Sequence, residues 1–326
     1  MNGSSQGNYS DEPVCLFNAS AFFITTLSLI SLASIIGNIF VISAVYRKPV
    51  LRTSTNYYYV NMAVSDIIFC LMAWPFFLTG KIFISKGSVI EGPLATYACK
   101  TSLYLRLASY LVSVCSLVLI AFDRFVGIVY PFKVYLLSRK LRVTLISATW
   151  LLSLSSCCPI FLFSSEYNDG QKSYCRYWWG GEKAVISSLV GTSFATFVPL
   201  GAIIILYQLI MRVLKQNPFQ ETSPPGINPG YWRNKTCKKT MYLFIVIVDA
   251  FFVCWLTPYV TSVVEMFAPE LVLKDHCHWI EGLSYTVFPS LSTVMNPVIL
   301  FSLSSRFREA LPTLLPISFS KWKACC

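Results

Sequence analysis

The sequence predicts an all-α fold, a bundle of seven membrane-spanning helices followed by a short amphipathic eighth helix. Of its 326 residues, 55% are hydrophobic and only 13% are charged, whereas soluble globular chains carry about a quarter charged residues. The apolar residues fall into seven long blocks, and roughly 20 such residues cross a hydrocarbon core of about 30 Å. The blocks Val143–Phe163 and Ala184–Met211 contain no charge, although soluble core helices of that length usually show a polar stripe.

The seven predicted spans are Phe22–Val45, Tyr57–Leu78, Leu103–Val129, Val143–Phe163, Ala184–Met211, Met241–Val264 and Trp279–Phe301. Each is expected to be helical, because backbone polar groups in lipid must be satisfied within their own segment. Residues 1–20 form a predicted extracellular tail, 21–303 the spanning domain, and 304–326 the amphipathic helix with a cytoplasmic tail. Ser304–Leu311 has the composition of a helix that lies on the membrane surface.

The orientation follows from the charge pattern. The net charge is +11, and the basic residues concentrate in the segments on the C-terminal side of the predicted membrane. Because cytoplasmic loops carry an excess of Lys and Arg, the C-terminus is predicted inside and the N-terminus outside, in a multi-pass plasma-membrane protein. The basic balance therefore indicates topology and not a nucleic-acid partner.

The tail and the cysteines agree with this orientation. Asn2, Asn8 and Asn18 each begin a glycosylation sequon, which only an external tail would use. Cys15, Cys99, Cys175 and Cys277 fall on the predicted outer side, and four cysteines allow three pairings. Cys325 and Cys326 end the chain beside Lys321 and Lys323 and are predicted palmitoylation sites, with free thiols as the alternative.

Two loops are long. The second outer loop, residues 164–183, carries Cys175 among several aromatic residues. The third inner loop, between about Lys215 and Lys239, is rich in proline and glycine. That composition predicts no regular structure there.

Polar and proline residues inside the spans follow a specific order, and each intramembrane polar group needs a reason to be there. In chain order they are Gly37-Asn38, Asn61-Met-Ala-Val-Ser-Asp66, Asp123-Arg124-Phe125, Trp150, Pro199 with Tyr207, Cys254-Trp255-Leu256-Thr257-Pro258 and Asn296-Pro297. Together they resemble the rhodopsin-like (class A) G-protein-coupled receptors over nearly all of the chain. Within that family the pattern from Arg52 to Asp66, together with the aromatic second outer loop, is most similar to neuropeptide receptors.

The resemblance implies a switch for a heterotrimeric G protein at the inner end. Asp123 would hold the neighbouring Arg124 at rest and release it on activation, since a planar guanidinium can exchange one partner for another. The resemblance gives Tyr207, Asn296 and Pro297 parts in the same switch. It also implies a bond from Cys99 to Cys175, which leaves Cys15 with Cys277.

Three departures from the family pattern affect the switch. Lys238 and Lys239 stand where an acid usually latches the sixth helix to the third, which puts that ionic latch in doubt and permits basal activity, and Asp249 is a candidate alternative partner. Leu300 replaces a usual tyrosine and cannot make the water-bridged contact to Tyr207. One additional residue separates Trp255 from Pro258, which predicts an altered direction for the indole.

Five oxygen-bearing side chains match the family's polar pocket, which holds a sodium ion: Asn38, Asp66, Ser113, Ser292 and Asn296. Oxygen ligands suit such a hard cation. The alternative is a satisfied hydrogen-bond network without an ion. No other metal or cofactor is expected, because the two histidines, His276 and His278, lie together in an outer loop.

The resemblance places the ligand cavity at the outer end, with candidate residues Arg106, Tyr110, Trp255, Tyr259 and Glu281. Arg106 stands where amine receptors carry an acid, so an amine is disfavoured and an anionic or carbonyl group is favoured. The alternative is an internal ion pair between Arg106 and Glu281. Tyr110 and Tyr259 would form aromatic walls, or simply pack in the core.

The sequence therefore predicts a receptor and not an enzyme. Its expected partners are an extracellular ligand, most simply a neuropeptide, a heterotrimeric G protein and membrane lipid. A receptor for a lipid or small anionic metabolite is the alternative suggested by Arg106, and a transporter or channel is the competing class.

Overall fold

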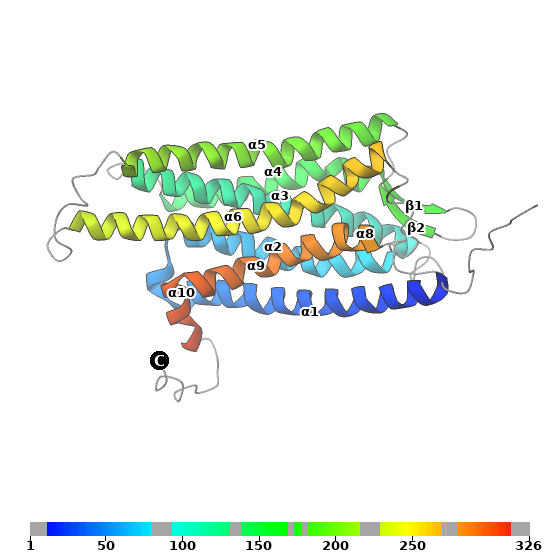
Figure 1. Cartoon of the computed structure of the whole chain (residues 1–326), viewed down its shortest axis with the longest axis horizontal. Helices are drawn as coiled ribbons and strands as arrows, with labels where there is room; N and C mark the ends of the chain where they lie inside the picture. The colour runs from blue at the N-terminus through cyan, green and yellow to red at the C-terminus, as the bar shows by residue number, and fades with distance from the viewer. Residues whose placement is uncertain are drawn as a thin grey trace, which may run out of the picture.

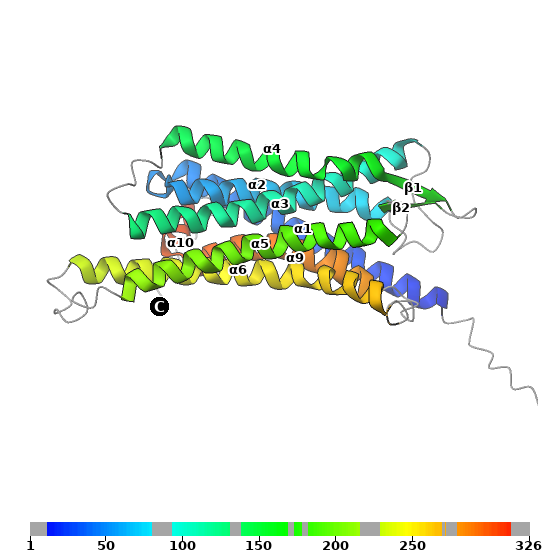
Figure 2. The same ribbon diagram turned by 90° about the horizontal axis from the view of Figure 1, so that it is seen from above.

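The computed structural model describes residues 12–79, 93–130, 138–168, 173–177, 182–215, 229–268, 271 and 279–313. Long helices lie side by side along one axis (Figures 1 and 2). They are α1 (Glu12–Arg47), α2 (Ser54–Thr79), α3 (Pro93–Val129), α4 (Arg139–Phe163), α5 (Glu182–Lys215) and α6 (Pro229–Phe267). The seventh span runs through α8 (Trp279–Gly282), the π-helical turn η5 (Leu283–Val287) and α9 (Phe288–Leu303).

The remaining elements lie at the two ends of the bundle. The end that carries α10 (Ser305–Ala310) and the short turns η1 (Pro49–Leu51) and η6 (Leu311–Thr313) is here named the inner end, after the predicted topology. The opposite, outer end carries an antiparallel hairpin of β1 (Ser164–Asn168) and β2 (Ser173–Tyr177) (Figure 1).

The bundle is built to lie in lipid. Six of the described helical segments are each long and apolar enough to cross a membrane, and α2, with 26 residues, packs along α3 among them. Large apolar side chains face outward, among them Leu29, Leu151 and Phe194, which are 64%, 69% and 66% exposed. Apolar surface of this extent marks contact with a membrane or another protein, and on helices of this length it fits the hydrocarbon core of a membrane. The predicted all-α bundle of seven spans is confirmed, and the chain is a multi-pass membrane protein.

Helix α3 forms the centre of the packing. It contacts α2, α4, α5 and α6, and Figure 2 shows it running between neighbouring helices. Its buried positions include Leu117 and Ile120, both fully covered. The residues that carry polar chemistry on α3, from Arg106 to Arg124, are therefore held on a helix fixed from several sides.

The first and last spans approach each other closely at a glycine. A Cβ added to Gly37 of α1 would lie 2.8 Å from Cγ of Pro297 on α9, a distance that real Cβ atoms essentially never show. Gly37 therefore allows α1 to pack directly on the proline ring. This contact fixes α1 beside the inner half of the seventh span.

The predicted amphipathic helix is confirmed as α10. Phe307 and Ala310 are buried, whereas Arg306, Arg308 and Glu309 are exposed. Phe307 packs edge-on against Phe301 of α9, with ring centroids 5.7 Å apart. The apolar face of α10 thus packs against α9 at the inner end of the bundle, and its charged side chains are exposed.

The structure departs from the predicted boundaries in three places. Helix α1 begins at Glu12, so the end of the predicted tail, including Asn18, is helical. The prediction that the third inner loop lacks regular structure is wrong from Pro229 onward, because α6 begins there with proline in its first turn. The hairpin within residues 164–183 was not predicted.

Candidate functional site

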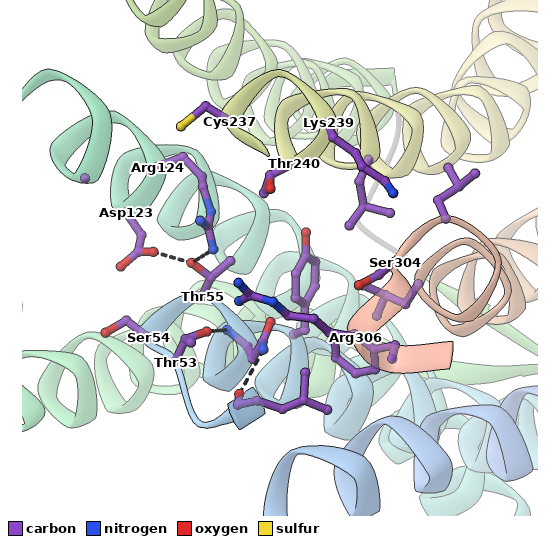
Figure 3. A pocket seen from close by; sticks show the side chains of 18 of the residues that line it. Thr53, Ser54, Thr55, Asp123, Arg124, Cys237, Lys239, Thr240, Ser304 and Arg306 are labelled. Atoms are coloured by element: carbon purple, nitrogen blue, oxygen red, sulfur yellow. Dashed lines mark hydrogen bonds between the residues drawn. The ribbon is translucent and has the colours of Figure 1, made fainter. Parts of the chain in front are cut away.

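A groove opens at the inner end between α2, α3, α6, α9 and α10, with a volume of about 810 Å³ (Figure 3). Its polar lining residues are Thr53, Ser54, Thr55, Asn56, Tyr59, Asp123, Arg124, Cys237, Lys239, Thr240, Ser304, Ser305 and Arg306. Asp123 is the single acid among the lining residues that the structure describes, beside the bases Arg124, Lys239 and Arg306. The groove is therefore predominantly basic.

Thr55 of α2 joins the two charged residues at the inner end of α3. Its hydroxyl donates a hydrogen bond to Oδ2 of Asp123 and accepts one from the Arg124 guanidinium; both bonds are drawn in Figure 3. The remaining carboxylate oxygen of Asp123 and Nε of Arg124 are buried with no hydrogen-bond partner among the described residues. The predicted hold of Asp123 on Arg124 is therefore indirect in this conformation and passes through Thr55.

The sixth helix adds no acid to this arrangement. Within the described residues, α6 lines the groove through Cys237, Lys239, Thr240 and Leu243, so no carboxylate of α6 faces Arg124 there. Asp249 does not replace the missing latch, because it is exposed on α6 while Arg124 bonds to Thr55. The prediction that Asp249 is an alternative partner is wrong for this conformation.

Leu300 also lines the groove, and it is 1% exposed. Tyr207 of α5 packs partly buried against the same apolar core. With a leucine at 300, the seventh span contributes an apolar side chain to this core. The water-bridged contact between these two positions is therefore not available to this chain.

A polar cluster lies deeper in the bundle around Asp66 of α2. Its carboxylate accepts hydrogen bonds from Asn296 Nδ2 at 2.8 Å and from Ser113 Oγ at 3.3 Å, and Ser113 also bonds to Ser65 at 2.8 Å. Asp66 is 3% exposed. Three helices thus share one buried carboxylate, with donors directed at it from α3 and α9.

The other two predicted members of the pocket bond elsewhere. Asn38 donates to the carbonyl oxygens of Ser34 and Thr293, at 2.9 and 3.0 Å. Ser292 donates to the carbonyl oxygen of Pro289 at 2.7 Å and accepts a bond from the Trp255 indole at 3.2 Å. The structure therefore joins Asp66, Ser113 and Asn296 directly, while Asn38 and Ser292 tie the seventh span to α1 and α6.

Trp255 reaches the centre of the bundle despite the additional residue before Pro258. Its ring lies 4.0 Å from that of Tyr110 and 5.7 Å from that of Phe69, measured between centroids. Tyr110 also stacks in parallel on Phe251 at 5.9 Å. The indole thus connects α2, α3, α6 and α9 at one level.

The two candidate tyrosines of the ligand cavity face other helices. Tyr110 is 3% exposed and shares a hydrogen bond of 2.9 Å with Thr196 of α5, so it packs in the core below the outer end. Tyr259 shares a bond of 3.1 Å with Ser193 of α5 and packs edge-on against Phe197. In this conformation both hydroxyls link α5 to its neighbours.

Arg106 occupies the junction of α2, α3 and the seventh span. It is 8% exposed, donates a hydrogen bond of 3.0 Å to the carbonyl oxygen of Tyr285, and lies 4.8 Å over the Phe69 ring. Tyr285 belongs to the π-helical turn, a feature common at functional sites. Glu281 lies one turn earlier, on α8, and its ion pair with Arg106 stays a prediction.

Above Arg106, a polar network joins α6 to the seventh span. The Tyr285 hydroxyl donates to Glu265 Oε2 at 3.0 Å and shares a bond of 2.9 Å with Ser262. Thr261 donates to Ser284 at 2.7 Å. The roles of Tyr285, Glu265 and Thr55 were missed from the sequence. Tyr285 and Glu265 stand outside the motifs that carried the resemblance to the family, and Thr55 lies within one of them, Arg52-Thr-Ser-Thr-Asn56, but was given no role there.

The covalent predictions are tested only in part. Cys99 is disulfide-bonded, and α3 contacts β2, the strand that carries Cys175. The side chains of Cys15, Cys175 and Asn18 lie outside the described part of the structure, as do residues Cys277, Asn2, Asn8, Cys325 and Cys326. Their pairing and modification stay predictions.

Comparison with known proteins identifies the family. Residues 37–300 match the model of the 7 transmembrane receptor (rhodopsin family). The chain is 25% identical to somatostatin receptor type 2 of Mus musculus, over 96% of this chain and 82% of that protein. It is 26% identical to the RYamide receptor of Drosophila melanogaster, over 90% of this chain and 63% of that protein.

Neuropeptide Y receptor type 2 of Sus scrofa is 28% identical, over 90% of this chain and 76% of that protein. These relatives are receptors and not enzymes. The family match covers most of the chain, from Gly37 in the first span to Leu300 in the last. The chain therefore belongs to the rhodopsin family of seven-transmembrane G-protein-coupled receptors.

Proposed function

We propose that the chain is a plasma-membrane receptor, with its N-terminus outside, that transmits binding of an extracellular peptide to a heterotrimeric G protein. Three of its relatives are receptors named for peptides: somatostatin, RYamide and neuropeptide Y. The aromatic residues of the second outer loop suit a peptide, because Tyr and Trp supply large contact areas with hydrogen-bonding handles.

The observation that carries the proposal is the inner groove with Arg124 inside it. Arg124 is half-buried, bonds to an uncharged hydroxyl, and lies beside further bases from α6 and α10. A guanidinium bonded to a single uncharged hydroxyl can exchange Thr55 for a charged acceptor on an incoming protein. A G protein bound in this groove would stabilise the conformation in which that exchange has occurred.

The seventh span offers a route from the outer end to this groove. Tyr285, Ser292 and Asn296 bond in turn to Arg106 of α3, Trp255 of α6 and Asp66 of α2. A ligand that moves the outer part of this span changes the geometry of all three bonds. Its effect is a population shift, whose size equals the difference in its affinity for the two conformations.

A second candidate ligand class is a lipid or small metabolite with a carboxylate or phosphate. Arg106 supports it, because a buried guanidinium that donates to a carbonyl oxygen can donate to a charged oxygen instead. A peptide with an acidic side chain or a free C-terminus would satisfy the same group. The two classes differ in size, and therefore in whether they also contact the outer loops.

We also propose that Asp66 holds a sodium ion in one conformation. The carboxylate, the Ser113 hydroxyl and the Asn296 amide supply oxygen atoms of the kind a hard cation takes. The ion would supply positive charge to a buried carboxylate that otherwise has only hydrogen-bond donors. Its release would accompany rearrangement of α9 against α2.

The test is a ligand screen in cells that report cAMP and calcium, with peptide, lipid and small-acid libraries run in parallel. We expect a peptide to raise or lower one of these signals in cells expressing the wild type. Arg124→Ala should abolish the signal while surface expression persists. Responses to lipids or small acids, with none to peptides, would replace the peptide proposal by the second candidate.

A further inference from the structure

Asp249 is a carboxylate on the outward face of α6, within the membrane. It is exposed, and at helical spacing around it lie Tyr242, Val253, Leu256 and Val260, which are 61%, 63%, 46% and 48% exposed. These side chains form a stripe that faces hydrocarbon. Asp249 lies in the middle of it.

Its depth in the membrane follows from the length of α6. At about 1.5 Å per residue, Asp249 lies about 15 Å along the axis from Lys239 and about 24 Å from Glu265, the nearest charged residues on either side along the chain. A long Lys or Arg side chain can extend to the interface from such a position. An aspartate is too short to do so.

Two other ionisable residues deep in this bundle differ from Asp249 in being buried and hydrogen-bonded. Asp66 and Arg106 are buried and hydrogen-bonded between helices, which is the usual arrangement for ionisable groups in membranes. No hydrogen bond or ion pair reaches Asp249 from any residue that the structure describes. Asp249 therefore has no polar partner among the described residues of its own chain.

We propose that the α6 stripe is a docking surface for a transmembrane helix of another membrane protein, which carries a Lys or Arg at mid-membrane to pair with Asp249. Charge complementarity favours such a helix over a second copy of the chain, because Asp249 pairs with a base. Between the ends of the seven predicted spans the sequence holds Arg106 and Arg124 as its only bases. Both bond inside the bundle, so a second copy has no cation to present.

The position of the surface gives binding a consequence for the inner groove. Thr240 and Leu243, which line the groove, lie on the same part of α6. Pro258, inside α6, removes a backbone hydrogen bond on the outer side of Asp249. A helix bound along the stripe is thus attached to the segment of α6 whose movement would open or close the groove.

The binding test uses the purified full-length protein in phosphatidylcholine liposomes, with no agonist or G protein. The probes are dye-labelled Leu-Ala transmembrane peptides of about 24 residues, with Lys, Leu or Glu at the central position. Energy transfer from labelled receptor to peptide reports association. Because no signalling is needed, a failure of the proposed function would leave this result unaffected.

We expect the wild type to bind the Lys peptide about tenfold more tightly than the Leu peptide, within the range of interhelical polar contacts. Asp249→Leu should remove that preference, and Asp249→Lys should transfer it to the Glu peptide. Val253→Leu, one turn away on the same stripe, is the matched control and should keep the wild-type preference.

Three results would overturn the proposal. One is equal binding of the Lys peptide by the wild type and Asp249→Leu. Another is energy transfer between receptors that depends on Asp249 in the absence of peptide, which would make a second copy the occupant. The third is a large loss of thermal stability in Asp249→Leu without peptide, which would show that the carboxylate supports the fold of its own chain.

Discussion

The guanidinium of Arg124 on α3 donates a hydrogen bond to the hydroxyl of Thr55 on α2. This bond joins the principal base of the inner groove to an uncharged group. Because Thr55 also donates to Asp123, a single hydroxyl orients both charges. The resting position of Arg124 therefore depends on one threonine.

Replacing that threonine should raise basal signalling. Thr55→Val keeps the shape but removes both hydrogen bonds, and bonds to charged groups contribute about 1.5–3 kcal/mol each. We expect basal nucleotide exchange by the G protein to rise by about tenfold or more, because tenfold corresponds to about 1.4 kcal/mol, close to the lower limit for one such bond. Thr55→Ser, which retains the hydroxyl, should stay near the wild type. Equal basal rates in all three would show that Thr55 does not restrain Arg124.

The contact between Gly37 and Pro297 predicts a stability effect. In Gly37→Ala the new methyl group would lie 2.8 Å from the proline ring, and overpacking of this kind destabilises by about 1–3 kcal/mol. A lower Tm of the purified receptor is expected. Gly201→Ala is the matched control, because a Cβ there meets nothing within 4 Å. An equal Tm for both variants would contradict the close approach.

The polar cluster predicts a sodium effect. If sodium binds at Asp66 and is released on activation, raising NaCl should lower agonist affinity of the wild type. N-methylglucamine chloride at the same ionic strength should not. Asp66→Asn retains the shape and much of the hydrogen bonding but removes the charge, so its agonist affinity should be independent of sodium. If sodium lowered agonist affinity equally in the wild type and in Asp66→Asn, Asp66 would not be the sodium site.

The position of Arg106 predicts that the receptor recognises a carboxylate on its ligand. For an agonist with a carboxylate, Arg106→Gln should lower affinity by about tenfold or more, as expected for loss of a charge-assisted hydrogen bond. The same agonist with that carboxylate converted to an amide should bind both receptors almost equally. Radioligand competition measures both affinities. If Arg106→Gln lowered the affinity for the acid and for the amide equally, Arg106 would act by packing against Tyr285 and Phe69 and not by binding the carboxylate.

The sequence predicted the spans and α10 because their signals are local. Long apolar segments that cross lipid form helices, because their backbone polar groups must bond within the segment. The spacing of Phe307 and Ala310 places both residues on one face of a helix. The hairpin of residues 164–177 lacked such a signal, since its strands are short and polar. The start of α6 at Pro229 was missed because proline was taken to end regular structure, whereas it also favours the first turn of a helix.

The sequence identified many of the residues of the site but few of the contacts between them. Asp66, Ser113 and Asn296 lie in contact as expected. Arg106 instead bonds to the backbone carbonyl of Tyr285, and a backbone partner cannot be identified from residue types. The bridging role of Thr55 depends on the packing of α2 against α3. The direction of Trp255 depends on the rotation of the whole of α6, which spacing from Pro258 alone does not determine.

The most direct test of the proposed function is nucleotide exchange with purified components. Receptor in lipid nanodiscs is mixed with a heterotrimeric G protein from each subfamily, and GTPγS binding is measured with and without the agonist found in the screen. We predict that agonist accelerates exchange on at least one G protein, and that Arg124→Ala abolishes this while agonist still binds. Agonist binding with no exchange on any G protein, together with transport of the ligand or of ions by the protein in liposomes, would contradict it.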